Sequence, residues 1–566
     1  MTNEAKSDGV TRREILLGAA GAAAAAVIPA SSTGAFAQDS TVSGIVFEDT
    51  SGAGVRGPND SGLPDILVSN GKDVAVTDAQ GRYSLPLPQE ATIFVVKAAG
   101  FMPPVDPVTQ LPRFYRLHQP GGSPASLGLA FEGIEPTGPL PASLDFALRR
   151  QDEPKKFDVV LFTDPQPESD AEVDFIREDV IEALAGTPAK FGLTAGDVMF
   201  DDLSLYERYN RIIGAIGLPW WNIGGNHDLN FEAPDRRYSR ETFKRVYGPN
   251  YYAFFYADAL FLMLDDVDYL GADRTKPHMA GKYEGRLDAP QLEFVKNILA
   301  RTPQDKLIVM VLHIPLRNYL DDEPGTNLTN AKELFALFEG RRYTVSFSGH
   351  THTTEHHYFD AADGWTGPTP HHHHVMTAVS GSWWSGPYDH RGVACADSRD
   401  GSPNGFHILS IDGLAYKTRF VPAKEPNGRQ IRLSVESRFH GDQREVKRDF
   451  RAGQLLGSPI AHAAVAATSI VANVFDGGPR TKVAMTIGGR APIEMTRQTM
   501  PDPFVEEVFA RNEATKKPWI KAELSSHMWV ARLPADLPPG THRVVVEAIT
   551  EYGDAVSGRI ALEVTG

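Results

Sequence analysis

Hydrophobic residues follow different patterns in successive parts of the chain. From about Thr41 to Pro120, short runs rich in Val and Ile, such as TVSGIVFED and ATIFVVKAAGF, are separated by Gly, Asp, Asn and Pro. Short apolar runs bounded by turn residues are typical of a small β-sandwich. A segment rich in Gly, Pro and Ser follows and is expected to be a linker.

The pattern changes between about Lys155 and Lys424, where apolar β-like runs alternate with helical spacing. The run FDVVLFTD, for example, precedes Val173, Ile176 and Val180, which recur as on one face of a helix. Such alternation predicts an α/β domain. After a connector near Ala423–Gln430 the chain returns to short strands, which predicts a second β-sandwich.

Residues 1–37 are expected to be an export signal and not part of the fold. The adjacent Arg12 and Arg13 precede an apolar, Ala-rich segment that ends at the small-x-small site Ala35-Phe36-Ala37. These are the parts of a signal peptide. The paired arginines resemble a twin-arginine signal, and the alternatives are an ordinary secretory signal or an uncleaved anchor. We therefore expect a periplasmic or otherwise exported protein that uses the twin-arginine export machinery.

These patterns predict five segments: a signal peptide at 1–37, an N-terminal β-sandwich at 38–120, a linker at 121–154, a central α/β domain at 155–424 and a C-terminal β-sandwich at 425–566. No stretch after the signal is apolar for long enough to predict a stable membrane span. Lys and Arg number 56 against 72 Asp and Glu, a net charge of −16, so nucleic acid is not an expected partner. The single cysteine, Cys395, excludes an intrachain disulfide.

Five predicted strands of the central domain end in residue types that bind metal ions. These residues are Asp164, Gln166, Asp197, Asn226, His227, Asp228, His313, His350 and His352. Ligands of α/β sheets collect beyond the carboxyl ends of the strands. One such cluster would be weak evidence, whereas five on separate strands predict a shared metal site.

In this order the motifs DPQ, GD, GNHD, a histidine after an apolar strand and GHTH resemble the signature of the calcineurin-like metallophosphoesterases. Flanking segments, among them GIVFEDTSGAGV and HMWVARLPADLPPGTH, resemble a bacterial exported subgroup with β-domains on both sides of that core. The resemblance implies an α/β (α+β) core of four layers, in which helices flank two mixed β-sheets. It also implies two all-β accessory sandwich domains.

The resemblance further implies two divalent or trivalent metal ions, drawn from Fe, Mn, Zn and Mg. The implied ligands of one ion are Asp164, Gln166, Asp197 and His352, and those of the other are Asp197, Asn226, His313 and His350. Asp197 would bridge ions about 3.5–4 Å apart, which can clamp an in-line displacement. His227 is expected to protonate the leaving oxygen or to stabilise phosphoryl charge, and Asp228 is expected to orient His227.

Two positions depart from the family pattern. Gln166 stands where most members carry a histidine, and Asp201 and Asp202 are offset from an aspartate often found after the second motif. An amide oxygen favours iron, manganese or magnesium over a purely zinc site, unless Gln166 makes no bond to the ion. Asp201 and Asp202 are expected at most to contact the ligands from behind and not to bind an ion themselves.

Several residues keep more than one interpretation. His356 and His357 would lie at the surface or behind the ligands, and the tract His371–His374 would face phosphate, face solvent or pack internally. Trp383 and Trp384 would wall a pocket for an organic leaving group or fill the junction with the C-terminal domain. Arg391 or Tyr388 could bind a phosphate oxygen.

The expected function is an exported binuclear-metal phosphoesterase that hydrolyses a phosphomonoester or phosphodiester with a metal-activated hydroxide. One alternative is a nucleotidase or pyrophosphatase. Another is a non-catalytic cell-envelope binding protein with a vestigial metal site. The sequence does not determine the natural substrate, the metal or the oligomeric state.

Overall fold

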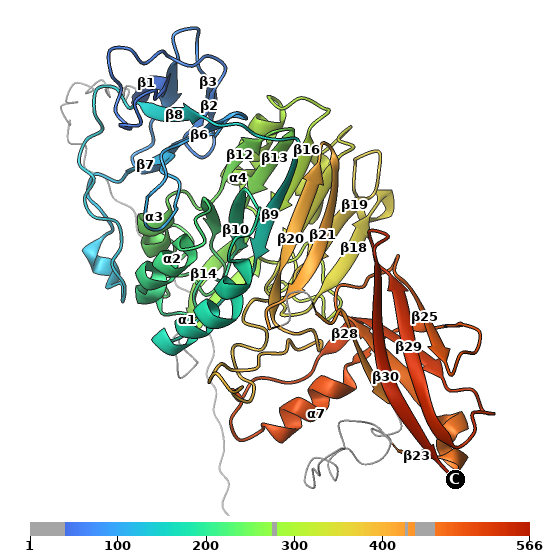
Figure 1. The fold of residues 1–566 in the computed structure, drawn as a ribbon. Coiled ribbons are helices and arrows are strands. Elements are labelled where there is room, and N and C mark those ends of the chain that lie inside the picture. Colours follow the sequence, from blue (N-terminus) through green and yellow to red (C-terminus); the bar gives the residue numbers. More distant parts are fainter. Residues whose placement is uncertain (1–39, 274–279, 425–427, 436–458) are drawn as a thin grey trace, which may run out of the picture. The chain divides into compact units, whose positions relative to one another are not determined.

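Two mixed β-sheets with helices packed against them form the central part of the chain in the computed structural model (Figure 1). The structure describes residues 40–273, 280–424, 428–435 and 459–566. The signal peptide predicted at residues 1–37 lies outside the described residues, as does part of the connector Ala423–Gln430.

The first central sheet has the order β11-β10-β9-β20-β21. Its strands are β9 (Lys156–Phe162), β10 (Phe191–Ala195), β11 (Trp220–Ile223), β20 (Gly405–Asp412) and β21 (Ala415–Pro422). Strands β9, β10 and β11 are parallel, so their carboxyl ends meet at one edge. Strand β20 pairs antiparallel with β9, and β21 pairs antiparallel with β20.

The second central sheet has the order β12-β13-β16-β17-β19-β18. Its strands are β12 (Tyr252–Tyr256), β13 (Ala259–Met263), β16 (Leu307–Val311), β17 (Thr344–Ser348), β18 (Glu355–Phe359) and β19 (His371–Val375). The inner strands β13, β16, β17 and β19 run parallel. The edge strands β12 and β18 are antiparallel to their neighbours.

Alternate residues of β9 contribute to two different hydrophobic cores, as the two-residue period of a strand requires. Val159 and Leu161 belong to the core that includes the second sheet, whereas Val160 and Phe162 pack with the helices. Those helices include α1 (Asp170–Ile176), α2 (Tyr206–Gly214) and α3 (Glu241–Tyr247). Helices α4 (Ala289–Leu299) and α5 (Ala331–Ala336) pack into the core of the second sheet. The expected core of mixed sheets and helices is confirmed.

Helix α1 begins where the sequence pattern predicts a helix. Ser169 caps it by accepting a hydrogen bond from the Glu172 N–H, and Val173 and Ile176 are buried. The chain continues as a π-helical turn at Arg177–Ile181 and a 3₁₀ turn at Glu182–Leu184.

The N-terminal region is β-rich, with sheet orders β4-β1-β8-β6 and β3-β2-β5-β7. Its strands are β1 (Thr41–Glu48), β2 (Leu67–Ser69), β3 (Val74–Val76), β4 (Arg82–Pro86), β5 (Ala91–Val95), β6 (Phe101–Met102), β7 (Tyr115–His118) and β8 (Phe146–Arg150). Strand β8 falls in the segment predicted as a linker, yet it pairs in parallel with β1. The N-terminal β-region therefore includes part of residues 121–154.

The C-terminal region is also β-rich, with sheet orders β22-β24-β28-β27 and β23-β30-β29-β25-β26. The first sheet comprises β22 (Ile431–Val435), β24 (Ser469–Val474), β27 (Thr496–Pro501) and β28 (Leu524–Arg532). The second comprises β23 (Ile460–Ala461), β25 (Lys482–Ile487), β26 (Ile493–Glu494), β29 (Gly540–Ile549) and β30 (Ala555–Thr565). Trp529, Met485 and Val546 show that both sheets contribute to one core. Helix α7 (Pro503–Arg511) lies between β27 and β28 in the chain.

A hairpin of β14 (Val267–Asp273) and β15 (Ala280–Gly285) extends from the central region. Within the described parts of the chain, no helix is long and apolar enough to span a bilayer.

Candidate metal centre

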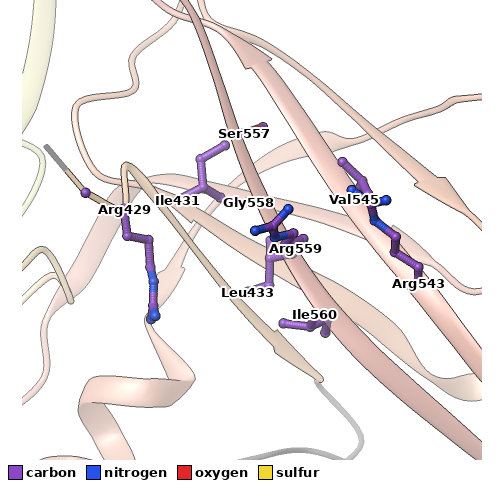
Figure 2. Close-up of a pocket in the computed structure, with 10 residues that line it drawn as sticks. Arg429, Ile431, Leu433, Arg543, Val545, Ser557, Gly558, Arg559 and Ile560 are labelled. Atoms are coloured by element: carbon purple, nitrogen blue, oxygen red, sulfur yellow. The ribbon is translucent and has the colours of Figure 1, made fainter.

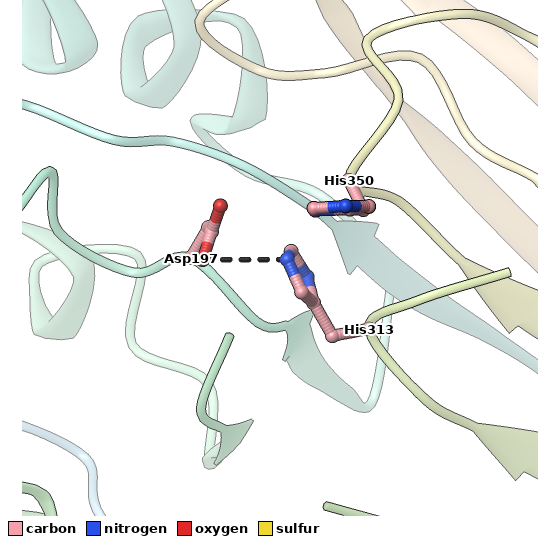
Figure 3. A group of neighbouring side chains, drawn as sticks. All are labelled: Asp197, His313 and His350. Atoms are coloured by element: carbon pink, nitrogen blue, oxygen red, sulfur yellow. Dashed lines mark ion pairs between the residues drawn. The ribbon is translucent and has the colours of Figure 1, made fainter. Parts of the chain in front are cut away.

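The loops after β9, β10, β11, β16 and β17 bring the predicted metal ligands together. Figure 3 shows Asp197 from the loop after β10 beside His313 and His350, which follow β16 and β17. Asp197 Oδ1 lies 3.3 Å from His313 Nε2. One ligand atom from each of these three residues lies within 4.8 Å of the other two. The group therefore has the spacing of a metal site.

The remaining predicted ligands adjoin this group. Gln166 Nε2 donates a hydrogen bond to Asp197 Oδ2 at 2.6 Å, and Asn226 Oδ1 lies 3.0 Å from His313 Nε2. His352 Nε2 lies 3.6 Å from Asp164 Oδ1. Each of the seven side chains is buried except His350, which is partly exposed. The structure thus brings all seven residues together, while their role as ligands stays a prediction.

A backbone carbonyl contacts one ring nitrogen of every predicted histidine ligand. His313 Nδ1 lies 3.0 Å from the Ala195 carbonyl oxygen, and His352 Nδ1 contacts that of Gly381. His350 Nε2 lies 2.9 Å from a third carbonyl oxygen, that of Gly325. An imidazole that donates from one nitrogen presents the lone pair of the other, as metal-binding histidines do.

Three buried side-chain atoms that could bind a metal ion have no hydrogen-bond partner. They are Asp164 Oδ1, Gln166 Oε1 and His352 Nε2. Leaving a buried polar atom unsatisfied costs about 1–3 kcal/mol, so such atoms call for an explanation. All three belong to the set predicted to hold one ion with Asp197. A metal ion bound there would satisfy them, and the residues present fit a metal.

Strained backbone is concentrated in the same loops. Five of the seven predicted ligands have a positive φ: Asp164 (50°), Gln166 (39°), Asp197 (50°), His350 (74°) and His352 (53°). A positive φ raises the conformational free energy of residues other than glycine, so the surrounding structure must hold them in place. Such strain is typical of functional sites. It lets the side chains point in directions that a relaxed backbone at the end of a strand would not allow.

Burial and neighbouring charges set the protonation of the three predicted histidine ligands. Burial, followed by the charge of His313, lowers the pKa of His350 to about 3, and burial also lowers the pKa of His352 to about 3. Both rings are therefore neutral near pH 7, as metal ligands must be. Burial lowers the pKa of His313 too, but Asp197 and the other nearby carboxylates outweigh it and raise that pKa to about 10.

His227 lies beside the group, and its orienting partner differs from the expectation. His227 Nδ1 lies 2.7 Å from Asp201 Oδ1, whereas the hydrogen bonds of the Asp228 carboxylate go to Gly225, Val198, Met199 and Tyr206. Burial lowers the pKa of His227, but Asp197 and Asp201 together raise it to about 9. The ring is therefore protonated near neutral pH and able to donate a proton.

Asp228 instead ties two loops together. Its carboxylate accepts hydrogen bonds from the N–H groups of Gly225 at 2.9 Å, Val198 at 2.9 Å and Met199 at 3.1 Å, and from the Tyr206 hydroxyl at 2.8 Å. The expectation that Asp228 orients His227 was wrong because these four donors already occupy the buried carboxylate. Its contacts tie the backbone that follows Asp197 to the loop that carries Asn226.

Aromatic side chains line the partly exposed side of His227. Phe200 stacks on the His227 ring with centroids 4.4 Å apart and planes at 19°. Trp519, from the C-terminal region, stacks on Phe200 at 5.9 Å and 5° and is 49% exposed. Sequence reasoning missed both residues, because neither belongs to a motif and the C-terminal region is distant in the chain.

The two tryptophans left open by the sequence have different surroundings. Trp383 stacks on His352, with ring centroids 3.8 Å apart. Trp384 is buried, and its Nε1–H donates to the Pro165 carbonyl at 3.1 Å. Trp384 therefore packs behind the loop that carries Asp164, whereas Trp383 lies against a predicted ligand.

The predicted phosphate contacts do not reach the group. Arg391 is held by Asp179 at 2.6 Å and by Asp389 at 2.9 Å. Tyr388 is 71% exposed, and its ring packs near Phe175.

The histidine tract is internal. All four residues of His371–His374 are buried in β19. On one face His371 and His373 lie 2.8 and 2.7 Å from the Ser346 hydroxyl. His356 and His357 are buried in β18, so the alternative of a surface position was wrong for both. The histidines are buried because β19 pairs with β17 and β18 inside the sheet, although polar side chains are usually exposed.

Asp266 is a further residue that the sequence motifs did not single out. Its Oδ1 accepts the His313 N–H at 3.0 Å and the Ile314 N–H at 3.3 Å, and it is completely buried. Burial raises the pKa of Asp266 to about 7. Asp266 holds the backbone that presents His313. Its position just after β13 was the one feature of the sequence that could have indicated a role near the site.

A separate pocket lies in the C-terminal region (Figure 2). Arg543, Arg559, Val545 and Ile560 are among its lining residues, and none of the predicted metal ligands lines it.

Comparisons with known proteins agree with the motifs. Residues 157–354 match the family model for calcineurin-like phosphoesterases. Residues 51–132 match the model for the N terminal of calcineurin-like phosphoesterase, and residues 373–555 match that for its C terminal. No curated protein sequence matches the chain significantly.

Solved structures show weaker overall similarity. A purple acid phosphatase from yellow lupin (Lupinus luteus) seeds is 12% identical, with a TM-score of 0.35, over 65% of this chain and 69% of that chain. A dimetal phosphatase from Danio rerio is 13% identical, with a TM-score of 0.30, over 46% of this chain and 98% of that chain. The three family models account for the central, N-terminal and C-terminal regions in turn, and the chain therefore belongs to the calcineurin-like phosphoesterases.

Proposed function

We propose that this protein is an exported, metal-dependent phosphoesterase that hydrolyses a phosphomonoester or phosphodiester. The observation that carries the proposal is the convergence of six predicted ligands, several with unpartnered buried atoms, around Asp197. The family to which the chain belongs supports the same reaction class.

Two ions would be held by overlapping sets of residues. Asp164, Gln166 and His352 would hold the first together with Asp197, because their unpartnered atoms are Asp164 Oδ1, Gln166 Oε1 and His352 Nε2. Asn226, His313 and His350 would hold the second together with Asp197. The carboxylate of Asp197 has two oxygens, so it can serve both sets. Ions bound there would supply Lewis-acid chemistry, lowering the pKa of water and neutralising phosphoryl charge.

The chain itself supplies a proton donor and its support. His227 is protonated near neutral pH, and its Nδ1 contact with Asp201 leaves Nε2 to face a leaving oxygen. The backbone N–H of His227 donates a hydrogen bond to Asp197 Oδ1 at 2.9 Å, which ties His227 to the proposed bridging carboxylate. His227 would therefore protonate the departing alkoxide, and Phe200 would hold its ring plane.

A nucleotidase is a second candidate, and the exposed Trp519 favours it. Trp519 and Phe200 present nearly parallel rings next to His227, where a planar leaving group could stack. Substrates with a planar leaving group would then be preferred over those with an aliphatic one.

The oxygen of Gln166 in place of an imidazole nitrogen makes the first site richer in oxygen. We propose iron, manganese or magnesium there in preference to a purely zinc pair. Elemental analysis of protein exported by its own host tests the metal identity, and zinc alone at that site would contradict the assignment.

The experiment is a hydrolysis assay of wild type and Asp197→Asn with each added metal. Substrates are p-nitrophenyl phosphate, bis-p-nitrophenyl phosphate, nucleotides and glycerophosphodiesters. Wild type should turn over at least one of them, and Asp197→Asn should lose both turnover and the catalytic ions. Asp554→Asn, an exposed aspartate distant from the group in the fold, is the matched control.

A folded wild type that holds ions but hydrolyses none of these esters would contradict the proposal. It would favour the alternative of a cell-envelope binding protein with a vestigial metal site.

Export is a proposal that rests on the paired Arg12 and Arg13 and the site ending at Ala37. Replacing both arginines by lysine should retain the precursor in the cytoplasm of the host. Unchanged export of that variant would contradict the twin-arginine route.

A further inference from the structure

A second cluster of histidines lies where the two central sheets meet the C-terminal region. His356 comes from β18, His374 from β19 and His407 from β20, and Asp476 follows β24. His356 and His374 are direct partners across the antiparallel pair, so their side chains share one face. None of these four residues belongs to the group around Asp197.

Three imidazole nitrogens converge on a single carboxylate oxygen. Asp476 Oδ1 lies 3.3 Å from His356 Nε2, 3.0 Å from His374 Nε2 and 3.4 Å from His407 Nε2. A carboxylate oxygen has about two lone-pair sites, so it cannot accept three good hydrogen bonds. Hydrogen bonds with His356 and His407 account for two of the contacts, so hydrogen bonding leaves the His374 contact unexplained.

The contact between His374 and Asp476 is not a hydrogen bond. The His374 side chain is completely buried, and its Nε2 has no hydrogen-bond partner although it lies 3.0 Å from Asp476 Oδ1. The nitrogen is close to the oxygen but is not directed at it as a donor. A buried nitrogen in that arrangement is what a ligand of a shared ion would show.

The spacing fits tetrahedral coordination. Zinc bonds of about 2.0–2.1 Å to nitrogen and oxygen place neighbouring tetrahedral ligands about 3.3 Å apart. The distances from Asp476 Oδ1 to His356 Nε2 and His374 Nε2, 3.3 and 3.0 Å, lie around that value. His356, His374 and Asp476 each offer one ligand atom within 4.8 Å of the other two.

The opposite ring nitrogens of His356 and His374 have partners of their own, whereas that of His407 is buried without one. His356 Nδ1 lies 2.9 Å from His372 Nε2, and His372 Nδ1 lies 3.0 Å from the Tyr416 hydroxyl. His374 Nδ1 lies 3.4 Å from the Thr418 hydroxyl. Such contacts behind a ligand fix the ring and leave Nε2 for an ion.

We propose that His356, His374 and Asp476 bind a structural zinc ion, while His407 Nε2 contacts the same Asp476 oxygen from outside this three-residue group. The two imidazole nitrogens and one carboxylate oxygen suit zinc, and the burial of the histidines suits a structural role for the ion. The ion joins the second central sheet to the C-terminal region, which also carries Trp519. This assignment does not depend on the phosphoesterase reaction.

The first test is the zinc content of Asp476→Asn, with Asp554→Asn as the matched control. Both variants are expressed with zinc and then dialysed against metal-free buffer. Asp476→Asn should hold one zinc per chain fewer than wild type, and Asp554→Asn should hold the same amount as wild type. Equal zinc content in wild type and folded Asp476→Asn would overturn the proposal.

A second test separates this site from the group around Asp197 and does not need Asp476→Asn to fold. In Asp197→Asn, added zinc should still raise the melting temperature, because an ion that binds only the native state stabilises it. Adding His374→Gln to that chain should remove the zinc-dependent rise. No rise with zinc in Asp197→Asn would overturn the proposal.

Discussion

At the scale of single residues, the direction of each imidazole in the metal centre depends on a backbone carbonyl. The carbonyls of Ala195, Gly325 and Gly381 contact one ring nitrogen each, so the other nitrogen is available to an ion. The sequence predicted the histidines from their place after strands, but not these partners. Gly381 follows the GHTH motif by many residues and contacts His352 only because β19 returns beside β17. The same distance in the chain hid the contact between Asp201 and His227.

His227→Ala should keep the bound ions and slow hydrolysis, because the variant loses the donor of a proton to the leaving oxygen. General acids contribute about 10²–10⁴-fold, so the loss should approach that range for alkyl esters. It should be much smaller for p-nitrophenyl esters, whose leaving group needs no proton. Rates across a series of leaving groups, together with metal content, check this.

His542→Ala, which replaces a partly exposed histidine of the C-terminal region, is the control and should match wild type. An equal loss in His227→Ala for good and poor leaving groups would argue against proton donation by His227.

At the scale of elements, the site depends on short loops that leave parallel strands with positive φ. The hydrophobic runs predicted the strands β9, β10, β16 and β17 and the place of the ligands at their ends. They did not predict that β20 pairs with β9 or that β8 pairs with β1, since both pairings join distant segments. Polar composition also hid β19, whose four histidines are buried by neighbouring strands.

Gly225→Ala should displace the ligands without unfolding the protein. A Cβ at Gly225 would overlap Asp197 Oδ1 and the Asp197 backbone nitrogen. A shift of about 1 Å in a catalytic group can cost about 100-fold in rate, so we expect a loss of that order and weaker metal retention. Circular dichroism, metal content and turnover measure the three effects.

The matched control is Gly121→Ala, because a Cβ at Gly121 meets no atom within 4 Å. Wild-type turnover in Gly225→Ala would show that the position of Asp197 does not limit the reaction.

At the scale of the whole molecule, the C-terminal region contributes to the edge of the metal centre. Lys517 Nζ lies 3.2 Å from Glu168 and 3.1 Å from Glu172, which belong to the segment after β9. These ion pairs hold Trp519 over Phe200. The sequence predicted β-rich regions on both sides of the core, but their contacts with the site arise only from tertiary packing.

Trp519→Ala should raise KM for nucleotides and aryl phosphates and leave metal content unchanged. Aromatic contacts contribute about 0.5–1.5 kcal/mol, which corresponds to about 2- to 12-fold in affinity. Trp519→Phe should restore most of that loss, because it keeps a stacking ring. A change in kcat with an unchanged KM would contradict a role in holding the leaving group.

The most direct test of the metal centre is anomalous X-ray scattering from crystals of the protein loaded with manganese or iron. The ligand assignment predicts two peaks about 3.5–4 Å apart, one on each side of the Asp197 carboxylate. A peak beside Asp164, Gln166 and His352 and another beside Asn226, His313 and His350 would match it. Fully loaded crystals with no peak at Asp197, or with a single ion that Asp197 does not contact, would contradict the account.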